Sequence, residues 1–289
     1  MTFNIRKLPV AEALAVAVAV VVLTGPWLAP HDPLAVDLTN ALAPPSADHW
    51  AGTDQLGRDV MSRVLTGGQT TVGISLAALF LSALVGIPIG LYSGLIGKRT
   101  DWTLMRFSDT FMAFPEYVVA IVVTGLLGPG FFNLLLAIVV VKWVGYARLA
   151  RSVVIQEKSK DYLMAARISG AGNTRIIVKH MFPHAVGPML ALAALDLGKV
   201  VLLVASLSFL GLGVPQPSPE WGSMLSEGRT YFSQTSMLML APGLAIFIVV
   251  LIANIVGDRL TEKFSGAGGS EETGEESKEK EALNAALAR

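Results

Sequence analysis

Residues that could do chemistry are few and scattered in this 289-residue chain. It has no cysteine, which excludes disulfides, thiolate metal sites and cysteine nucleophiles. Its histidines, His31, His49, His180 and His184, form no His-Glu-x-x-His arrangement and have no nearby carboxylate at ligand spacing. Pro183 separates His180 from His184 and favours a polar helix end over a ligand pair. We therefore expect no metal site and no catalytic residue.

The sequence also lacks the phosphate-binding loop of ATPases. No stretch has the form Gly-x-x-x-x-Gly-Lys-Ser/Thr, whose backbone cradles nucleotide phosphates. No nucleophile with a neighbouring base and no pair of catalytic carboxylates emerges either. The chain is therefore not expected to be an enzyme or to hold a cofactor, and any energy from ATP hydrolysis must be supplied by another subunit.

Four charged residues lie in apolar surroundings, where ions are costly and mark functional sites by default. Asp196 and Lys199 are three residues apart on one predicted helix face, so they can neutralise one another. Lys142 lies in another apolar segment, and Glu116 follows Pro115, where a helix can bend. These four residues are candidates for a translocation pathway or for a subunit interface, and both interpretations remain open.

Composition indicates a membrane protein. The chain is 53% hydrophobic and only 15% charged, and its mean hydropathy is +0.58. Six stretches approach the roughly 20 apolar residues that a helix needs to cross a bilayer. The sequence therefore predicts an all-α, polytopic membrane protein with six transmembrane helices, near Leu8–Leu28, Thr70–Leu91, Thr110–Leu127, Phe131–Ala150, His184–Ser208 and Met237–Val256.

Basic residues alternate between the segments that join these helices. Lys and Arg near membrane helices favour the cytoplasmic side, and the stretch from Arg148 to Lys179 holds the largest group. This asymmetry predicts that both termini are cytoplasmic. The first apolar run resembles a secretory signal but lacks a small-residue cleavage site, so we expect a retained helix.

Three regions follow from these patterns. Residues 1–69 are expected to form the first membrane helix and an external loop, and residues 70–264 a core of five membrane helices. Residues 265–289 are rich in glycine and then in glutamate and lysine, which predicts an acidic, disordered cytoplasmic tail.

The most informative cytoplasmic segment runs from Asp161 to Pro183. Its apolar and basic residues fit two short amphipathic helices that meet at the glycines of 170–172. Such a surface could dock into a groove of a partner protein. It could equally lie on anionic lipid headgroups, since the same pattern serves both.

This segment resembles the coupling loop of bacterial ABC importer permeases, whose pattern is Glu-Ala-Ala, then a glycine four residues later, and a proline that ends the second helix. Ala165, Ala166, Gly170 and Pro183 fit that pattern, whereas Met164 stands where the family usually has glutamate. The resemblance therefore does not carry over an ionic contact of that glutamate. It implies a loop that couples the chain to an ATPase, and its candidate residues are Ala165, Ala166, Arg167, Gly170, His180 and Pro183.

Further motifs resemble the dipeptide, oligopeptide and nickel branch of this family. They are Gly52-Thr-Asp-Gln-Leu-Gly-Arg-Asp59, Ser206-Leu-Ser-Phe-Leu-Gly-Leu-Gly213, Trp221-Gly222 and Gly257-Asp258. In the first motif, Arg58 can pair with a neighbouring carboxylate, and a role in ordering the external loop or touching a binding protein is favoured over substrate binding.

The resemblance implies a permease subunit in a cell inner membrane. Its expected partners are a second permease, two ATP-binding subunits that use ATP and Mg²⁺, an extracytoplasmic substrate-binding protein and membrane lipid, with no nucleic acid. The expected cargo is dipeptides or oligopeptides, and nickel or a metal chelate is the alternative. A carrier driven by an ion gradient remains the alternative of a different class, for which Asp196 would be the functional acid.

Overall fold

The computed structural model describes residues 10–287, with side chains from residue 13 to residue 262 except that of Arg167. Within this range the chain is helical, and the one β-bridge joins Thr53 to Asp59. The helices are α1 (Val10–Leu28), α2 (Val60–Ile96), α3 (Lys98–Met112), α4 (Glu116–Leu127), α5 (Phe131–Glu157), α6 (Asp161–Ile168), α7 (Asn173–Ile176), α8 (Phe182–Phe209), α9 (Trp221–Arg229) and α10 (Met237–Leu287), with a 3₁₀ turn at Leu38–Asn40 and a π-helical turn at Ile177–Met181.

Within the described residues, fewer helices qualify as membrane spans than the six predicted. Four helical stretches of the described chain are long and apolar enough to cross a membrane: Val60–Ile96, Phe131–Glu157, Asn173–Phe209 and Met237–Glu262. The bent pair of α3 and α4 brings the number to five if it counts as one span. The predicted first span begins at Leu8, outside the described residues, and the apolar part of α1, Ala13–Leu28, is short for a crossing.

The predicted third span at Thr110–Leu127 is wrong as a single straight helix. The chain breaks between α3 and α4, whose axes differ by 85°. Pro115 causes the break, because it has no N–H for the helical ladder and its ψ of 134° is extended. With 12 residues, α4 is about 18 Å long, too short to cross a hydrocarbon core of roughly 30 Å alone.

The most extensive helix packing joins α2 to α5. Gly86, Gly90 and Gly94 are spaced four residues apart on α2 and face α5. A Cβ atom at Gly90 would overlap the carbonyl oxygen of Ala147, and one at Gly86 would overlap that of Trp143. These glycines therefore let the two backbones approach closely, which is how helices associate in membranes.

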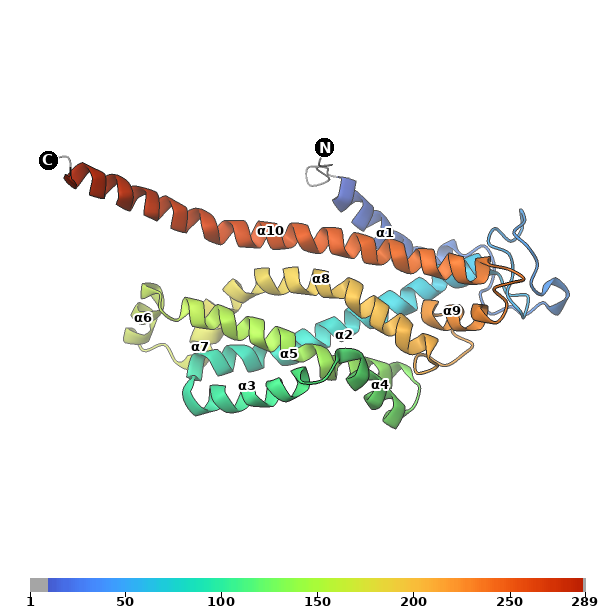
Figure 1. The fold of residues 1–289 in the computed structure, drawn as a ribbon, viewed down its shortest axis with the longest axis horizontal. Helices are drawn as coiled ribbons and strands as arrows, with labels where there is room; N and C mark the ends of the chain where they lie inside the picture. Colours follow the sequence, from blue (N-terminus) through green and yellow to red (C-terminus); the bar gives the residue numbers. More distant parts are fainter. Residues whose placement is uncertain (1–9, 288–289) are drawn as a thin grey trace.

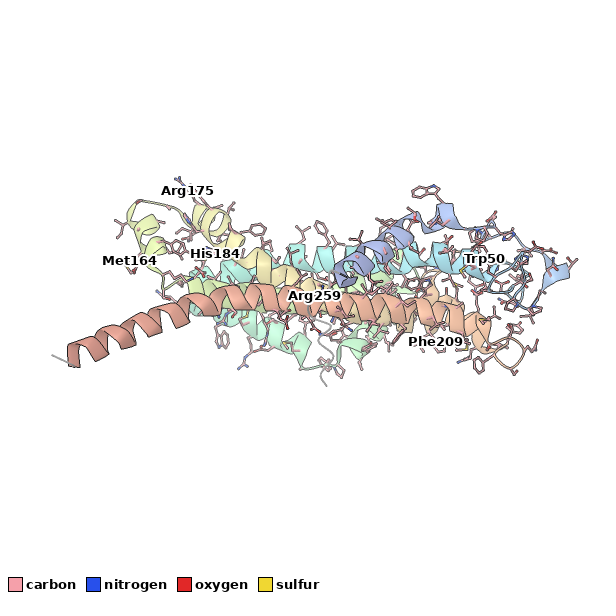
Figure 2. All side chains as sticks on the ribbon, turned by 90° about the horizontal axis from the view of Figure 1, so that it is seen from above. Trp50, Met164, Arg175, His184, Phe209 and Arg259 are labelled. Atoms are coloured by element: carbon pink, nitrogen blue, oxygen red, sulfur yellow. The ribbon has the colours of Figure 1, made fainter. Side chains whose placement is uncertain are left out.

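The helices form one elongated bundle with two distinct ends (Figure 1). One end, which we call the α6 end, carries α6 and α7. The opposite end, the α9 end, carries α9, residues 29–59 and the turn that leads into α10. Figure 2 shows Met164, Arg175 and His184 near the α6 end and Trp50 and Phe209 near the α9 end.

The last helix continues well past the bundle. The backbone of α10 runs helically to Leu287 and extends beyond the α6 end (Figure 1). The structure therefore gives a helical backbone where the sequence analysis expected a disordered tail. That tail, residues 265–289, remains a prediction, and its side chains lie outside the described residues.

Candidate functional site

The segment predicted to dock a partner, residues 161–183, is anchored to the bundle by its inner face. Leu163 on α6, Ile176 on α7 and Met181 in the π-helical turn are each almost fully buried. All three belong to the hydrophobic core built from α2, α5 and α8. Burying these apolar groups stabilises the position of the segment without using its outer face.

The outer face of this segment is unpacked and mixes apolar residues with the exposed basic residues Arg175 and Lys179. Ile168 is 82% exposed, and Met164 and Val178 are each 63% exposed. Ala165 is also exposed and Ala166 is half-buried, so their small side chains leave the backbone of α6 accessible. The side chain of Arg167 lies outside the described residues. Exposed apolar residues gathered on a projecting segment indicate an interaction surface.

The predicted turn between the two short helices is confirmed. Gly170 has a φ of +79°, a left-handed conformation that glycine adopts without strain. The N–H of Ala171 donates to the carbonyl oxygen of Ala166 and closes the end of α6. Gly172 then precedes Asn173, the first residue of α7. A Cβ atom at Gly170 or at Gly172 would meet open space, so backbone conformation alone explains the glycine at position 170.

The predicted position of Pro183 at the end of the second helix is wrong. Helix α7 has only four residues and passes through the π-helical turn directly into α8, where Pro183 lies in the first turn. A proline is tolerated there because the first N–H groups of a helix have no partner within it. The segment is therefore continuous with a long membrane helix.

Both histidines of this region flank one tyrosine. The ring of Tyr162 lies 6.1 Å from that of His180 and 6.0 Å from that of His184, between centroids. Its hydroxyl donates to Oε2 of Glu157 at 2.7 Å. Burial, together with this hydrogen bond to a carboxylate, raises the pKa of Tyr162. The group connects the start of α6 to the end of α5 and the start of α8.

The four charged residues singled out in the apolar segments come together. Lys142 Nζ on α5 lies 2.7 Å from Glu116 Oε2 at the start of α4 and 3.9 Å from Asp196 Oδ1 on α8. Lys199 Nζ lies 3.4 Å from the same oxygen of Asp196, so the predicted pairing of these two residues is confirmed. Lys142 and Asp196 are buried, whereas the side chains of Glu116 and Lys199 are 54% and 67% exposed.

These four charges form a row in which the two middle residues, Lys142 and Asp196, are buried and the two end residues, Glu116 and Lys199, are exposed. Lys142 is the central member, because it contacts a carboxylate on each side. Since buried ions in membranes need partners, this arrangement stabilises the break before α4 and links it to α8. The two exposed ends leave ionic groups accessible at the surface of this single chain.

A second ionic cluster lies at the α9 end and is buried. Arg58 donates from Nε to Asp54 Oδ2 at 2.6 Å and from Nη2 to Glu227 Oε2 at 2.9 Å. Arg63 lies 3.5 Å from the same two carboxylates, and Gln55 donates to Glu227 at 3.2 Å. The predicted pairing of Arg58 with a carboxylate is confirmed. The cluster joins the loop before α2 to α9, which stabilises this loop.

Glu220 provides another buried link between these elements. It precedes α9 and accepts hydrogen bonds from the N–H groups of Gly222 and Ser223 and from the hydroxyl of Thr71. Burial raises the pKa of Glu220, although these hydrogen bonds oppose the shift. The neighbouring Trp221 is buried and donates from Nε1 to the carbonyl oxygen of Val64. Trp221-Gly222 stands out in the sequence as a motif, whereas its contact with α2 is visible only in the folded chain.

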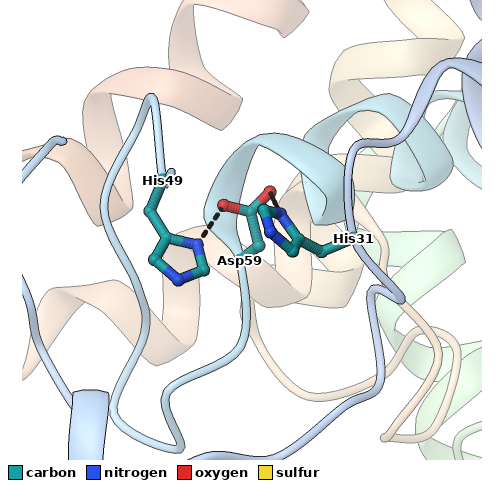
Figure 3. Close-up of side chains that lie close together, drawn as sticks. All are labelled: His31, His49 and Asp59. Atoms are coloured by element: carbon teal, nitrogen blue, oxygen red, sulfur yellow. Dashed lines mark hydrogen bonds and ion pairs between the residues drawn. The ribbon is translucent and has the colours of Figure 1, made fainter. Parts of the chain in front are cut away.

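One group in the described part of the chain combines enough potential ligands for a metal ion. His31, His49 and Asp59 place one ligand atom each within 4.8 Å of one another (Figure 3). The interpretation that the histidines have no nearby carboxylate is therefore wrong for His31 and His49. The loop before α2 folds back on the start of that helix, which local sequence spacing does not reveal.

Comparison with known proteins places the chain in a family. The family described as "Binding-protein-dependent transport system inner membrane component" matches residues 86–266. The chain is 43% identical over 244 residues to the nickel transport system permease protein NikC of Escherichia coli K12, covering 84% of this chain and 88% of NikC. It is 37% identical over 246 residues to the di/tripeptide transport system permease protein DppC of Pseudomonas aeruginosa UCBPP-PA14, covering 83% and 81% of the two chains.

The fold agrees with this result. An inward-facing structure of the MetNI methionine ABC transporter matches with a TM-score of 0.57 at 19% identity, covering 71% of this chain and 97% of that chain. At this identity the match supports the fold alone. On the family match and on its two relatives, the chain belongs to the binding-protein-dependent transport system inner membrane components.

Proposed function

We propose that this chain is the transmembrane permease subunit of an ATP-driven ABC importer. It works with a second, related permease, two cytoplasmic ATP-binding subunits and an extracytoplasmic binding protein that delivers the cargo. The partner subunits use ATP and Mg²⁺, and this chain holds neither. Family membership supports the general function, and the particular partners are inferred from it.

The exposed outer face of residues 161–183 is the observation that carries this proposal. Its inner face is fixed to the bundle, and its outer face exposes the apolar side chains of Met164, Ile168 and Val178. Arg175 and Lys179 are exposed on the same segment. A helix presented in this way suits insertion into a groove of a partner. Because Met164 is apolar, the docking surface relies on shape and apolar contact at this position.

A movement of this segment would be transmitted directly to a membrane helix. Helix α7 continues through the π-helical turn into α8 without a loop, and α8 carries Asp196. Closure of the ATP-binding subunits would push residues 161–183 and shift α8 against α5 and α4. The ionic row of Glu116, Lys142, Asp196 and Lys199 would then change its contacts. We place this row along the cargo pathway or at the contact with the second permease.

The proposed orientation has the α6 end and both termini in the cytoplasm. Arg175 lies near the α6 end (Figure 2). Lys158, at the end of α5, donates to the carbonyl oxygen of Leu95 beside the start of α3, where Arg99 lies, and these positions agree with the preference of basic residues for the cytoplasmic side.

At the opposite end, Arg58 and Arg63 are buried in ion pairs with Asp54 and Glu227. Because their charges are neutralised, they do not argue for a cytoplasmic position of that end. The α9 end would face the binding protein.

Dipeptides or oligopeptides are the proposed cargo. The similarity to the di/tripeptide permease DppC supports this choice. Nickel or a metal chelate is the second candidate, because the identity to the nickel permease NikC is higher. Uptake by vesicles that contain the complete importer should distinguish them: ATP-dependent uptake of a labelled dipeptide supports the first, and ATP-dependent uptake of radioactive Ni²⁺ supports the second.

Purification in mild detergent tests the importer assignment. The wild type should carry with it an ATP-binding subunit and a second permease. Ile168→Glu should reduce recovery of the ATP-binding subunit, because it places a charge on the exposed docking face. The substitution leaves the buried core of the chain unchanged, since Ile168 is exposed. Gly170→Asp should do the same through strain at positive φ. Phe232→Glu, an exposed residue at the α9 end, is the matched control.

The outcomes separate the importer from a carrier. Recovery of the chain alone under several gentle conditions would contradict the importer assignment and favour a carrier driven by an ion gradient. In that case Asp196→Asn should abolish transport while the chain still assembles. Loss of the ATP-binding subunit in Ile168→Glu, together with its recovery in Phe232→Glu, would support the proposed docking face.

A further inference from the structure

Two histidines and one carboxylate meet at the α9 end, where the chain after α1, the loop before α2 and the start of α2 come together (Figure 3). We propose that His31, His49 and Asp59 bind one divalent transition-metal ion. This site is separate from the ionic row in the membrane and from the docking face at the α6 end. It does not depend on which cargo the importer carries.

The separations suit coordination by one ion. His49 Nδ1 lies 2.9 Å from Asp59 Oδ1, which is about the distance between two ligands at right angles when each is about 2.1 Å from a metal. His31 Nδ1 lies 3.9 Å from Asp59 Oδ2, within the roughly 4.2 Å that two such bonds can span. All three ligand atoms lie within 4.8 Å, so a small turn of the His31 side chain, which is 42% exposed, completes the set.

The second imidazole needs an explanation beyond a hydrogen bond. His49 and Asp59 already form a complete hydrogen-bonded pair. The 3.9 Å between His31 and Asp59 is too long for a hydrogen bond, yet the two imidazole rings lie only 4.8 Å apart, between centroids. A metal ion shared by the three side chains accounts for the position of both rings.

The surrounding structure holds the ligands in place. Asp59 precedes α2, and its Oδ2 accepts hydrogen bonds from the N–H and the hydroxyl of Ser62 at 2.8 and 2.7 Å. The same hydroxyl accepts from the N–H of His31 at 3.0 Å. The carbonyl oxygen of His49 accepts from Ser46 and Gly52, each at 2.9 Å. Hydrogen bonds of this kind orient metal ligands and tune their affinity.

The ligand types select the metal. Imidazole suits zinc, copper, nickel and iron, whereas magnesium and calcium prefer oxygen ligands throughout. Three protein ligands leave coordination positions for water or another small molecule. Because both histidines are partly exposed, an ion could enter from solvent. We therefore expect Ni²⁺, Cu²⁺ or Zn²⁺ at this site.

Ion binding to the purified importer, without its binding protein, tests the site. After removal of metals with a chelator, equilibrium dialysis against Ni²⁺ should show one more bound ion per permease chain than in the double variant His31→Gln/His49→Gln. Each single variant should weaken this binding roughly tenfold or more. His184→Gln, which changes a histidine at the other end, should bind as the wild type does.

Electron paramagnetic resonance of bound Cu²⁺ identifies the ligands, because the spectrum shows how many imidazole nitrogens coordinate the ion. The wild type should show coupling to two imidazole nitrogens and His31→Gln to one, with unchanged circular dichroism as the check on folding. Equal Ni²⁺ binding by the wild type and the double variant would overturn the proposal. A loss of Ni²⁺ binding in His184→Gln as large as in the double variant would also overturn it. So would a His31→Gln spectrum that still shows coupling to two nitrogens.

Discussion

The ammonium group of Lys142 on α5 lies 2.7 Å from the Glu116 carboxylate that begins α4. This contact spans 26 positions of sequence and holds the start of α4 against α5 just after the Pro115 break. Lys142 also lies 3.9 Å from Asp196, so one buried cation connects α4, α5 and α8. The charged residues in the membrane therefore form one ionic unit.

Removing Lys142 should destabilise this unit. Lys142→Met leaves the buried Asp196 carboxylate with only the exposed Lys199 as partner, and breaking a buried pair costs about 3–5 kcal/mol. We expect a lower thermal unfolding midpoint in detergent, measured by intrinsic fluorescence. Lys142→Met/Asp196→Asn should recover part of the loss. A double variant as unstable as the sum of both single variants would contradict a coupled unit.

Close packing of α2 on α5 should fail when a side chain is added at Gly90. Gly90→Val places atoms where the Ala147 backbone lies, and overpacking typically costs about 1–3 kcal/mol. Folded yield and the unfolding midpoint should both fall. Gly73→Val is the control on the same helix, because a Cβ atom there meets nothing within 4 Å. Similar losses in the two variants would show that the cost comes from the helix backbone and not from the α5 contact.

Arg58 should hold the loop before α2 against α9, because it bonds to Asp54 in the loop and to Glu227 on α9. Arg58→Met leaves Asp54 and Glu227 paired only with Arg63, at 3.5 Å, and a buried charge that loses its partner costs about 3–5 kcal/mol. Limited proteolysis should therefore cut the loop before α2 faster. Glu227→Gln in the Arg58→Met background should slow that cleavage, because it removes one of the two carboxylates that lost a partner. No change in cleavage for Arg58→Met would contradict the structural role.

The raised pKa of Glu220 predicts how the stability of the protein changes with pH. Because its folded pKa is raised above the usual 4.5, the folded state binds more protons than the unfolded state between these two pKa values. The contribution of Glu220 to stability therefore falls as pH rises above about 4.5 and is unchanged below it. Relative to Glu220→Gln, the wild type should lose stability with rising pH. A constant difference in unfolding midpoint between pH 4 and pH 8 would contradict the shift.

Hydropathy located the four long membrane helices but not their ends. The predicted span Thr70–Leu91 lies inside α2, which starts ten residues earlier, at Val60. Arg63 lies in this added part and lowers its hydropathy, yet it is buried beside Asp54 and beside Glu227, which is 164 positions away. Similarly, α5 continues past Ala150 to Glu157, and Arg151 in this added part donates to Asp101, 50 positions away. Long-range pairing of charges is invisible to a window of neighbouring residues.

Local pattern singled out the segment 161–183 and the four charges in apolar segments, each by itself. The glycine turn at Gly170 followed from residue types alone, since few other residues adopt a positive φ. The contact of Lys142 with Glu116 and that of Arg58 with Glu227 depend on how distant elements pack. The sequence therefore singles out Lys142, Glu116 and Arg58 but neither of these contacts. The glycines of α2 at positions 86, 90 and 94 carried a readable signal, a small residue every fourth position, which the sequence analysis did not use.

Site-directed cross-linking in membranes tests the central claim most directly. The chain has no cysteine, so a single cysteine reports on one position. Ile168→Cys should cross-link to the ATP-binding subunit and resist membrane-impermeant maleimide added outside. Phe232→Cys should react with that reagent and form no such cross-link. Labelling of Ile168→Cys from outside, with no cross-link to an ATP-binding subunit, would contradict both the orientation and the docking face.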